Sequence, residues 1–354
     1  MAGGTGGHVY PALAIARELR AKGYRVEWLG TDRGLESRVV PDTGIHLNVI
    51  TASGFRGKSL LSKFFSVLRL LLAICQSLII LFRFKPGCVI GMGGYVALPG
   101  GLAAWLTMRP LIIHEQNAIA GTSNRLLVKF TKRVMVAYPN AFPKNIEVNV
   151  IGNPLRQQIV DAADREILGD SFGCDAQLKL LVLGGSLGAK ALNDVMPELT
   201  DLVADLNIFI WHQTGDAQVA LVEAEYRKRL RENVRINAYI ENIQDAYTWA
   251  DLVVCRAGAL TISELAVMSK PAILIPYPYA IDDHQTINGR WMSDQGGAVL
   301  VPQSELTAVK LETLLRELTG NSSSLDLMAM NSGHLAMANA AGLAAGICEE
   351  VYRD

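Results

Sequence analysis

Short runs of apolar residues alternate with segments of helical periodicity along most of this chain. The apolar runs end at glycine-rich turns near Gly91, Gly184 and Gly258, each followed by a helical pattern, and a similar turn stands at Gly3. Because a strand, a turn and a helix in succession build a parallel sheet, the pattern predicts an α/β fold. Its recurrence in both halves predicts two Rossmann-like, doubly wound domains that face one another across a cleft.

A polar, irregular stretch after residue 156 marks the boundary between these domains. We predict a first domain over residues 1–155, a second over residues 156–334 and a C-terminal helix over residues 335–354 that packs back toward the first. The turn at Gly3 has no apolar run before it, although a turn of this type normally follows a central strand. We therefore expect either that the protein starts before Met1 or that the N-terminal sheet lacks its first strand.

Residues 59–85 form the most apolar segment. Within it, residues 64–84 are close to the ~20 apolar residues that a transmembrane helix needs. The polar residues of this segment recur on one stripe, at Ser62, Ser66, Arg69, Gln76 and Arg83. An arginine in the middle of a span costs ~2.5–3.5 kcal/mol, which disfavours a crossing helix. A wide apolar face with basic flanks instead predicts a helix that packs on a sheet or lies in a membrane interface.

The charge of the chain is divided between its halves. The net charge is −1, but residues 1–150 carry 18 Lys and Arg against 7 Asp and Glu, whereas the remainder is acidic. A basic half is expected to face an anionic partner such as phosphates or a lipid surface. Its basic residues lack interleaved aromatics, which argues against nucleic acid. The five cysteines form no CxxC pair, as expected for reduced thiols in the cytoplasm.

The stretch from Asp251 to Glu264 predicts a ligand site. An apolar strand over residues 252–255 runs into a turn at Gly258 and then a helix. Such a turn offers free backbone N–H groups and the positive end of a helix dipole, which hold a diphosphate without a metal. Glu264 can reach a neighbouring pair of sugar hydroxyls, or it serves only as a capping acid.

Another strand ends in four polar residues, His114 to Asn117, at the sheet edge where α/β proteins bind ligands. The sequence has no Asp-x-Asp pair, no Walker loop and no clustered His/Cys ligands, and adjacent residues such as Asp282 and Asp283 chelate one ion poorly. We therefore expect no metal and no cofactor.

Seven motifs, taken together and in order, resemble those of the MurG family of N-acetylglucosaminyltransferases. They are Gly3-Gly-Thr-Gly-Gly-His8, Gly91-Met-Gly-Gly-Tyr95, His114-Glu-Gln-Asn117, Gly152-Asn-Pro154, Gly184-Gly-Ser186, Cys255-Arg-Ala-Gly-Ala-Leu-Thr-Ile-Ser-Glu264 and Gln285. The resemblance covers nearly the whole chain. It implies the two-lobed GT-B fold and an inverting, metal-independent hexosyltransferase.

The resemblance also implies a substrate pair and a location. N-acetylglucosamine would pass from UDP-N-acetylglucosamine to the muramoyl 4-hydroxyl of lipid I, giving lipid II for peptidoglycan synthesis. The protein would sit peripherally on the cytoplasmic side of the inner membrane, with cell-wall assembly proteins as further partners. The alternatives are a related glycosyltransferase with another glycolipid acceptor and an inactive nucleotide-sugar-binding scaffold.

Residue roles follow from the same resemblance. His8 would activate the acceptor, and Glu115 is the alternative base. Glu264 would hold the ribose, Ile240 would face uracil, and Ser186 with the start of the following helix would take the diphosphate. The implied donor contacts are Thr5, Gly6, Gly7, Asn117, Arg156, Ser186, Ile240, Ala259, Leu260, Thr261, Ile262, Ser263, Glu264 and Gln285.

Overall fold

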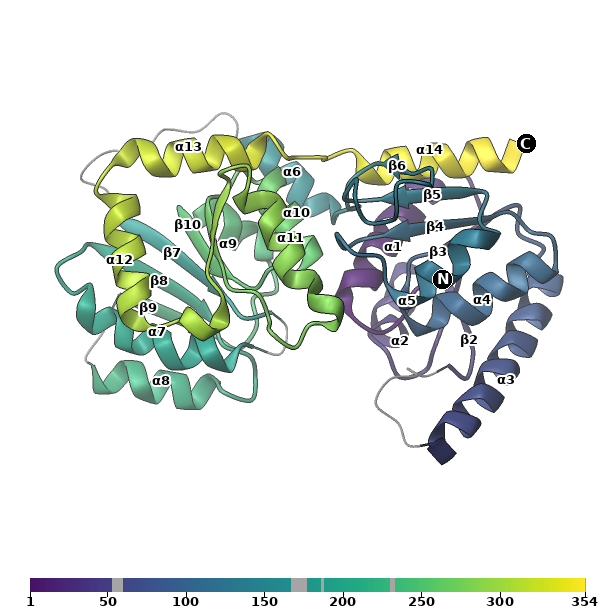
Figure 1. The fold of residues 1–354 in the computed structure, drawn as a ribbon, viewed down its shortest axis with the longest axis horizontal. Coiled ribbons are helices and arrows are strands. Elements are labelled where there is room, and N and C mark those ends of the chain that lie inside the picture. The colour runs from purple at the N-terminus through teal and green to yellow at the C-terminus, as the bar shows by residue number, and fades with distance from the viewer. Residues whose placement is uncertain (53–59, 167–176, 186–187, 230–232, 354) are drawn as a thin grey trace. The chain divides into compact units, whose positions relative to one another are not determined.

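The computed structural model describes residues 1–52, 60–166, 177–185, 188–229 and 233–353. The chain folds into two compact units (Figure 1). The first combines Met1–Arg156 with Met337–Asp354, and the second is Gln157–Ala336. Both have parallel sheets covered by helices, so the predicted pair of Rossmann-like domains is confirmed.

The first unit carries two separate parallel sheets. One pairs β1 (Glu27–Gly30) with β2 (His46–Val49), and the other has the order β3-β4-β5-β6. The strands of the second sheet are β3 (Val89–Gly91), β4 (Leu111–Glu115), β5 (Arg133–Val136) and β6 (Asn149–Val150). Among the described residues, β1 and β3 are not hydrogen-bonded to one another.

Helices from both ends of the chain cover the sheets of the first unit. They are α1 (Gly6–Ala21), α2 (Glu36–Val39), α3 (Leu60–Phe84), α4 (Gly94–Leu106), α5 (Thr122–Leu127) and α14 (Ala340–Arg353), with short 3-10 turns η1 (Pro41–Thr43) and η2 (Val128–Phe130). Ala344, Ala345 and Cys348 of α14 share one buried core with Val9 and Ile15 of α1. The C-terminal helix thus belongs to the first unit, although it starts later than the predicted residue 335.

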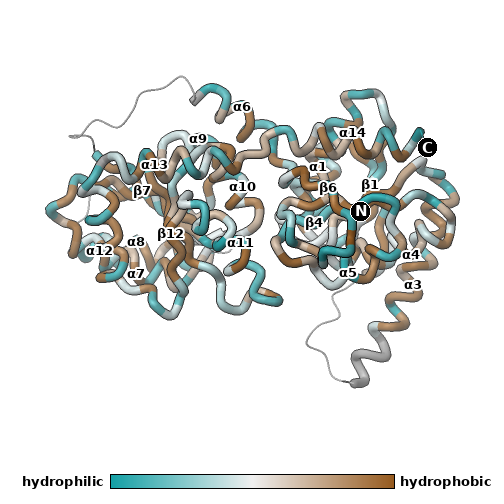
Figure 2. The backbone as a smooth tube through the Cα atoms, turned by 45° about the horizontal axis from the view of Figure 1, so that its top comes forward, coloured by the Kyte–Doolittle hydropathy of each residue, from teal (hydrophilic) through white to brown (hydrophobic). Residues whose placement is uncertain are grey.

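Much of helix α3 is hydrophobic (Figure 2), and many of its large apolar side chains are exposed. The described buried residues of α3 are Ser66, Ala73, Ser77 and Leu81, and Ala73 and Leu81 belong to cores of the unit. Six of its large apolar residues are exposed: Val67, Leu68, Leu71, Leu72, Ile79 and Phe82. The alternative in which the apolar face packs on a sheet is therefore wrong for these residues. The part of α3 from Ser66 to Phe84 is long and apolar enough to cross a membrane.

The second unit has one parallel sheet in the order β12-β11-β10-β7-β8-β9. Its strands are β7 (Leu178–Leu183), β8 (Ile208–Gln213), β9 (Val234–Asn237), β10 (Leu252–Cys255), β11 (Ala272–Leu274) and β12 (Ala298–Leu300). The chain winds outward from β7 in one direction and continues from β10 in the other. Ligands of open α/β sheets bind at such a reversal, beside the carboxyl ends of the two strands.

Eight helices of the described chain cover this sheet, with two 3-10 turns, η3 (Ile281–Asp283) and η4 (Gln303–Glu305). The helices are α6 (Gln157–Glu166), α7 (Lys190–Leu202), α8 (Val219–Lys228), α9 (Ile243–Trp249), α10 (Ala259–Val267), α11 (His284–Ser293), α12 (Ala308–Thr319) and α13 (Ser322–Gly333). The pattern did not predict α13, whose polar and apolar residues show little periodicity. Buried residues of β7, β8, β10, α7 and α12 form the main core.

Candidate functional site

The reversal point of the second unit is built from two tight turns. After β7, Gly185 and Gly188 adopt φ values of +85° and +77°, which favour glycine. A Cβ on Gly188 would also overlap the carbonyl oxygen of Thr214. This turn therefore brings bare backbone to the edge of the sheet. Ser186, a predicted diphosphate contact in the same turn, lies outside the described residues.

The second turn opens helix α10 without a side-chain cap. Gly258, the residue before the helix, is extended at φ −67° and ψ 143°. The N–H groups of the first helical turn have no carbonyl partner within the helix, and they carry the positive end of its dipole. Leu260 and Thr261 are half-buried here. The turn can therefore receive an anionic group such as a phosphate.

The predicted contacts from Ala259 to Ser263 divide by burial. Ala259 and Ile262 are buried, and no part of Ile262 is exposed to a ligand. The hydroxyl of Ser263 donates to the carbonyl oxygen of Ala259 (3.1 Å). Thr261 and Ser263 are half-buried, so their polar side chains are partly accessible to a ligand at the start of the helix.

Glu264 is oriented by a tyrosine that the sequence did not single out. The hydroxyl of Tyr247 in α9 donates to Oε2 of Glu264 (2.9 Å), and both side chains are buried. The Glu264 carboxylate also lies close to Cys255, where its charge adds to burial in raising the pKa of that thiol. A charge-assisted bond from a buried phenol holds the carboxylate in one position, as recognition of a hydroxyl pair requires.

A glutamine links two loops at the same sheet edge. Nε2 of Gln213, at the end of β8, donates to the carbonyl oxygen of Gly185 (2.9 Å). Its Oε1 accepts from the backbone N–H of Ile240 (2.9 Å). Because this bond occupies the N–H of Ile240, the backbone carbonyl of Ile240 is the group that could accept a hydrogen bond from a nucleobase. Gln213 was not predicted, since a polar residue at a strand end has no distinctive spacing.

Gln285 stands in the first turn of α11. Its Oε1 accepts from the backbone N–H of Tyr277 (2.9 Å), which fixes the side-chain amide across the loop between β11 and α11. The amide nitrogen is therefore the end that can donate to a ligand.

In the first unit, the N-terminal turn leads directly into α1. Thr5 precedes the helix in an extended conformation without capping it, and Gly6 and Gly7 form its first positions. Thr5 is exposed, whereas Gly7 and His8 are half-buried. The N–H of His8 donates to the carbonyl oxygen of Thr5 (3.1 Å), so Gly6 and Gly7 are the positions whose N–H groups can bind an anion or a sugar hydroxyl.

His8 lies against the second glycine turn of the first unit. A Cβ placed on Gly93 would stand 3.2 Å from Nε2 of His8 and 3.6 Å from Nδ2 of Asn124. Gly93 and Gly94 both have positive φ. The glycines therefore let the imidazole approach the backbone closely, and they place His8 near Asn124.

Arg156 joins the same group of residues. Its guanidinium lies over the ring of Tyr10, 5.1 Å from the centroid. Tyr10 itself borders Gly6, since a Cβ there would meet the Tyr10 ring at 3.1 Å. Arg156 is thus a positive charge held beside the start of α1. Its charge adds to the positive end of the helix dipole and favours an anion there.

His114 is a structural residue at the end of β4. Its Nε2 bonds to the carbonyl oxygen of Gly152 (2.9 Å), so Nε2 carries the proton, and Nδ1 accepts from Nε2 of Gln116 (3.1 Å). Burial lowers the pKa of His114 to about 4, although the Gly152 bond and Glu115 act in the opposite direction. The imidazole is therefore neutral at pH 7.

The carboxylate of Glu115 is fully engaged by neighbouring donors. Oε1 accepts from the backbone N–H (3.0 Å) and side-chain amide (3.2 Å) of Asn117, and Oε2 accepts from the N–H of Gly121 (2.9 Å) and from Asn124 (2.9 Å). These four donors occupy both oxygens of the carboxylate. This geometry makes Glu115 an organiser of the loop that carries Asn117, and it disfavours Glu115 as the base.

The structure thus groups the predicted residues in two places. Thr5, Gly6, Gly7, His8 and Arg156 surround the start of α1. Ile240, Glu264 and Gln285 lie around the carboxyl edge of the second sheet, together with the helix start at α10. Tyr10, Asn124, Gln213 and Tyr247 complete these groups and were not predicted. Asn124, Gln213 and Tyr247 belong to other elements than the residues they contact, so the sequence alone does not connect them to the site.

Comparison with known proteins assigns both units. Residues 1–136 match the glycosyltransferase family 28 N-terminal domain, and residues 179–344 match the family 28 C-terminal domain. A transferase of Colwellia psychrerythraea is 46% identical over 99% of this chain and 92% of its own length, and one of Pseudomonas syringae pv. syringae is 46% identical over 99% and 97%. Both are named UDP-N-acetylglucosamine–N-acetylmuramyl-(pentapeptide) pyrophosphoryl-undecaprenol N-acetylglucosamine transferase.

Solved structures agree with this assignment. The crystal structure of Acinetobacter baumannii MurG superposes with a TM-score of 0.82 at 36% identity, covering 99% of this chain and 98% of that one. A UDP-GlcNAc 2-epimerase from Neisseria meningitidis shares the fold at 12% identity and a TM-score of 0.68. The fold and its glycine turns define a glycosyltransferase of GT-B architecture. The chain belongs to glycosyltransferase family 28, and within that family to the MurG transferases.

Proposed function

We propose that this chain transfers N-acetylglucosamine from UDP-N-acetylglucosamine to the muramoyl 4-hydroxyl of lipid I, giving lipid II. Its full-length relatives carry that activity in their names. The observation that carries the proposal is the uncapped start of α10 beside Glu264, whose carboxylate is held by Tyr247. A diphosphate and an adjacent ribose need these two groups side by side.

The donor would be held without a metal. The amides at the start of α10 and the turn after β7 receive the diphosphate, Glu264 accepts from the ribose hydroxyls, and the Ile240 carbonyl accepts from uracil N3–H. Gln285 donates to the sugar. Arg156, Thr5, Gly6, Gly7 and Asn117 are the proposed donor contacts of the first unit. Helix dipoles oriented in advance stabilise the charge that develops on departing UDP.

His8 is the proposed base. In the inverting step, the acceptor oxygen forms a bond to the anomeric carbon, the bond from that carbon to the diphosphate oxygen breaks, and the acceptor proton passes to the imidazole. A neutral imidazole is suited to this near pH 7. The engaged carboxylate of Glu115 would instead position Asn117 and Asn124.

The proposed location of the protein at a membrane is based on helix α3. Its exposed apolar residues and the exposed Arg69, Arg83 and Lys85 are suited to an interface with anionic lipid. We propose that the protein binds peripherally to the cytoplasmic face of the inner membrane, where lipid I is presented and cell-wall assembly proteins gather.

One assay tests the reaction. Purified protein, UDP-N-acetylglucosamine and a water-soluble lipid I analogue should release UDP in EDTA at the same rate as in Mg²⁺. His8→Ala should lower kcat by about 10²–10³-fold, whereas His46→Ala, at an exposed position in β2, should leave it unchanged. Donor binding without turnover would support the scaffold alternative, and turnover only with another glycolipid would support the other transferase.

A further inference from the structure

A buried carboxylate lies beside the N-terminal glycine turn of the first unit. Glu36 opens α2 and is fully buried. Its Oε2 accepts from the backbone N–H of Gly4 (2.9 Å), and its Oε1 accepts from the N–H (3.0 Å) and the hydroxyl (2.7 Å) of Thr31, the residue after β1. Burying a carboxylate costs free energy unless hydrogen bonds compensate it, and these three donors do so. Glu36 therefore joins the end of β1 to the turn at Gly4.

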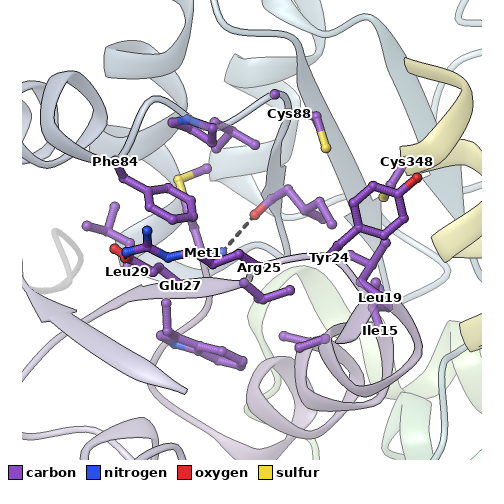
Figure 3. A pocket seen from close by; sticks show the side chains of 18 of the residues that line it. Met1, Ile15, Leu19, Tyr24, Arg25, Glu27, Leu29, Phe84, Cys88 and Cys348 are labelled. Carbon is purple, nitrogen blue, oxygen red and sulfur yellow. Dashed lines mark hydrogen bonds and ion pairs between the residues drawn. The ribbon is translucent and has the colours of Figure 1, made fainter. Parts of the chain in front are cut away.

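Gly4 is held by both of its backbone groups. Besides the N–H that Glu36 binds, its carbonyl oxygen accepts from the N–H of Leu35, the residue before α2 (3.3 Å). Gly4 has a φ of +101°, a conformation that favours glycine. The chain before the turn is fixed separately, because the nitrogen of Met1 donates to the carbonyl oxygen of Ile90 (2.8 Å; Figure 3). The start of α2 thus sets the bend that leads into α1.

Three glycines make room for this carboxylate. A Cβ on Gly3 would stand 2.6 Å from Oε1 of Glu36, and a Cβ on Gly30 would stand 2.8 Å from its Cγ. A Cβ on Gly34 would overlap Oε2, the atom that accepts from Gly4. Backbone from three segments therefore surrounds the side chain closely and leaves it little room to move.

Thr5 alone separates the held turn from α1. It is extended, and its carbonyl oxygen accepts from the N–H of His8 (3.1 Å) in the first turn of the helix. The second glycine turn packs against the same place, since a Cβ on Gly94 would stand 2.9 Å from the carbonyl oxygen of Gly3. A displacement of Gly4 would therefore move both Thr5 and His8.

We propose that Glu36 is a positioning residue for the transfer reaction: by holding the turn at Gly4, it places Thr5 and the imidazole of His8 at the start of α1. Because Glu36 is fully buried, it acts through the backbone and does not touch the substrates. A carboxylate suits this role because both of its oxygens accept, whereas an amide has one accepting oxygen. The role rests on the proposed function, in which His8 takes the acceptor proton.

Glu36→Gln tests the role, because it keeps the shape of the side chain and removes the bond to Gly4. The two donors of Thr31 occupy the one amide oxygen, so an NH2 group would face the N–H of Gly4. In the UDP-release assay with a water-soluble lipid I analogue, kcat should fall about 10–10²-fold, the order of loss that a displacement of about 1 Å causes. The dissociation constant of UDP, measured by titration calorimetry, should change by less than about threefold.

Thr31→Val is the matched control. It removes the hydroxyl donor of the same carboxylate, keeps the N–H donor and leaves the bond between Glu36 and Gly4 in place. It should lower the melting temperature about as much as Glu36→Gln does and leave kcat unchanged. A fall of kcat in both variants would reveal a merely structural role, and a fall in neither would show that the turn does not need the carboxylate. Either result overturns the proposal.

Gly34→Ala reaches the same bond while retaining Glu36. The added Cβ must push Oε2 away from Gly4, so kcat should fall as in Glu36→Gln. Amide exchange over residues 4–9 of the full chain should rise at least about tenfold in both variants and stay unchanged in Thr31→Val. This measurement needs no turnover: if the unmodified protein releases no UDP, the proposed function fails, yet exchange still decides whether Glu36 holds the turn. Unchanged exchange in both Glu36→Gln and Gly34→Ala overturns the positioning role even where the transfer reaction is observed.

Discussion

At the scale of single residues, the proposed site of the second unit depends on side chains that position other groups. Tyr247 and Gln213 are not expected to touch the reacting atoms, yet they hold Glu264 and Ile240. Such residues act through a hydrogen bond whose net value is about 1 kcal/mol, or about fivefold in a binding constant. Their contribution should therefore appear in donor affinity rather than in the chemical step.

Tyr247→Phe tests this role. Loss of the hydroxyl should raise the KM for UDP-N-acetylglucosamine about threefold to tenfold and leave kcat nearly unchanged, because only the orientation of Glu264 is affected. Tyr226→Phe is the matched control: its buried hydroxyl lies 3.1 Å from Nδ1 of His212, away from Glu264. It should lower the melting temperature without changing KM. Equal effects on KM from both variants would argue against a positioning role.

His114 gives the stability of the first unit a pH dependence. Its pKa is about 4 in the folded protein and about 6.5 in an unfolded chain, so between these values the unfolded state binds more protons. Stability is full above pH 6.5 and is lost as the pH falls toward 4. From pH 6.5 to 5 the loss from this residue is about 1.5 kcal/mol.

Urea unfolding at pH 5, 6 and 7 measures this dependence. His114→Gln should flatten it by about the amount given, while the exposed His46→Gln should leave it intact. An unchanged slope in His114→Gln would show that this imidazole is not kept neutral by the fold. His212 is also buried with a pKa lowered to about 3, so part of the slope should remain in either variant.

Individual residues also show where sequence reasoning stops. Glu264 and the glycine turns were predictable, because their spacing follows from strand, turn and helix. The partners Tyr247, Gln213 and Asn124 come from other elements and have no fixed spacing to the residues they contact. Glu115 stays a predicted alternative base, and the four donors around its carboxylate could not be predicted from its neighbours in sequence.

At the scale of elements, alternation predicted most strands and helices, but it did not determine the orientation of α3. Apolar periodicity normally marks the buried face, and here the described buried residues are Ser66, Ala73, Ser77 and Leu81. Six large apolar residues of the same helix, among them Leu71 and Leu72, lie on the exposed side instead. Amphipathicity alone cannot distinguish a face that meets protein from one that meets lipid.

The exposed face of α3 should control binding to anionic vesicles. Leu71→Glu combined with Leu72→Glu should weaken cosedimentation at least about tenfold, since each buried leucine contributes about 1.5–3 kcal/mol. The melting temperature should not fall, because both side chains are about half exposed. Leu221→Glu, on an exposed position of α8, should leave vesicle binding intact. Retention of full binding by the double variant would exclude this face as the anchor.

At the scale of the whole molecule, the chain leaves the first unit once and returns to it. Residues from Met337 onward complete a core begun at α1, and Lys22 and Glu349 form an ion pair at 2.5 Å across the same contact. The acidic second unit is thus inserted within a basic one. The charge distribution suggested different partners for the two halves. The sequence also predicted that a C-terminal helix packs back toward the first domain, and the shared core of α14 and α1 agrees with this.

Ala345→Glu should destabilise the first unit without destabilising the second. Ala345 is fully buried among residues of α1, so a charge there costs about 2–4 kcal/mol and should undock α14. Amide exchange should then rise in α1, β1 and β3, while the second unit keeps its protection and its affinity for UDP. Leu343→Glu, two residues away and 45% exposed, should change neither. If amide protection were lost in both units together, the two units would unfold as one, and α14 would stabilise the whole molecule rather than the first unit alone.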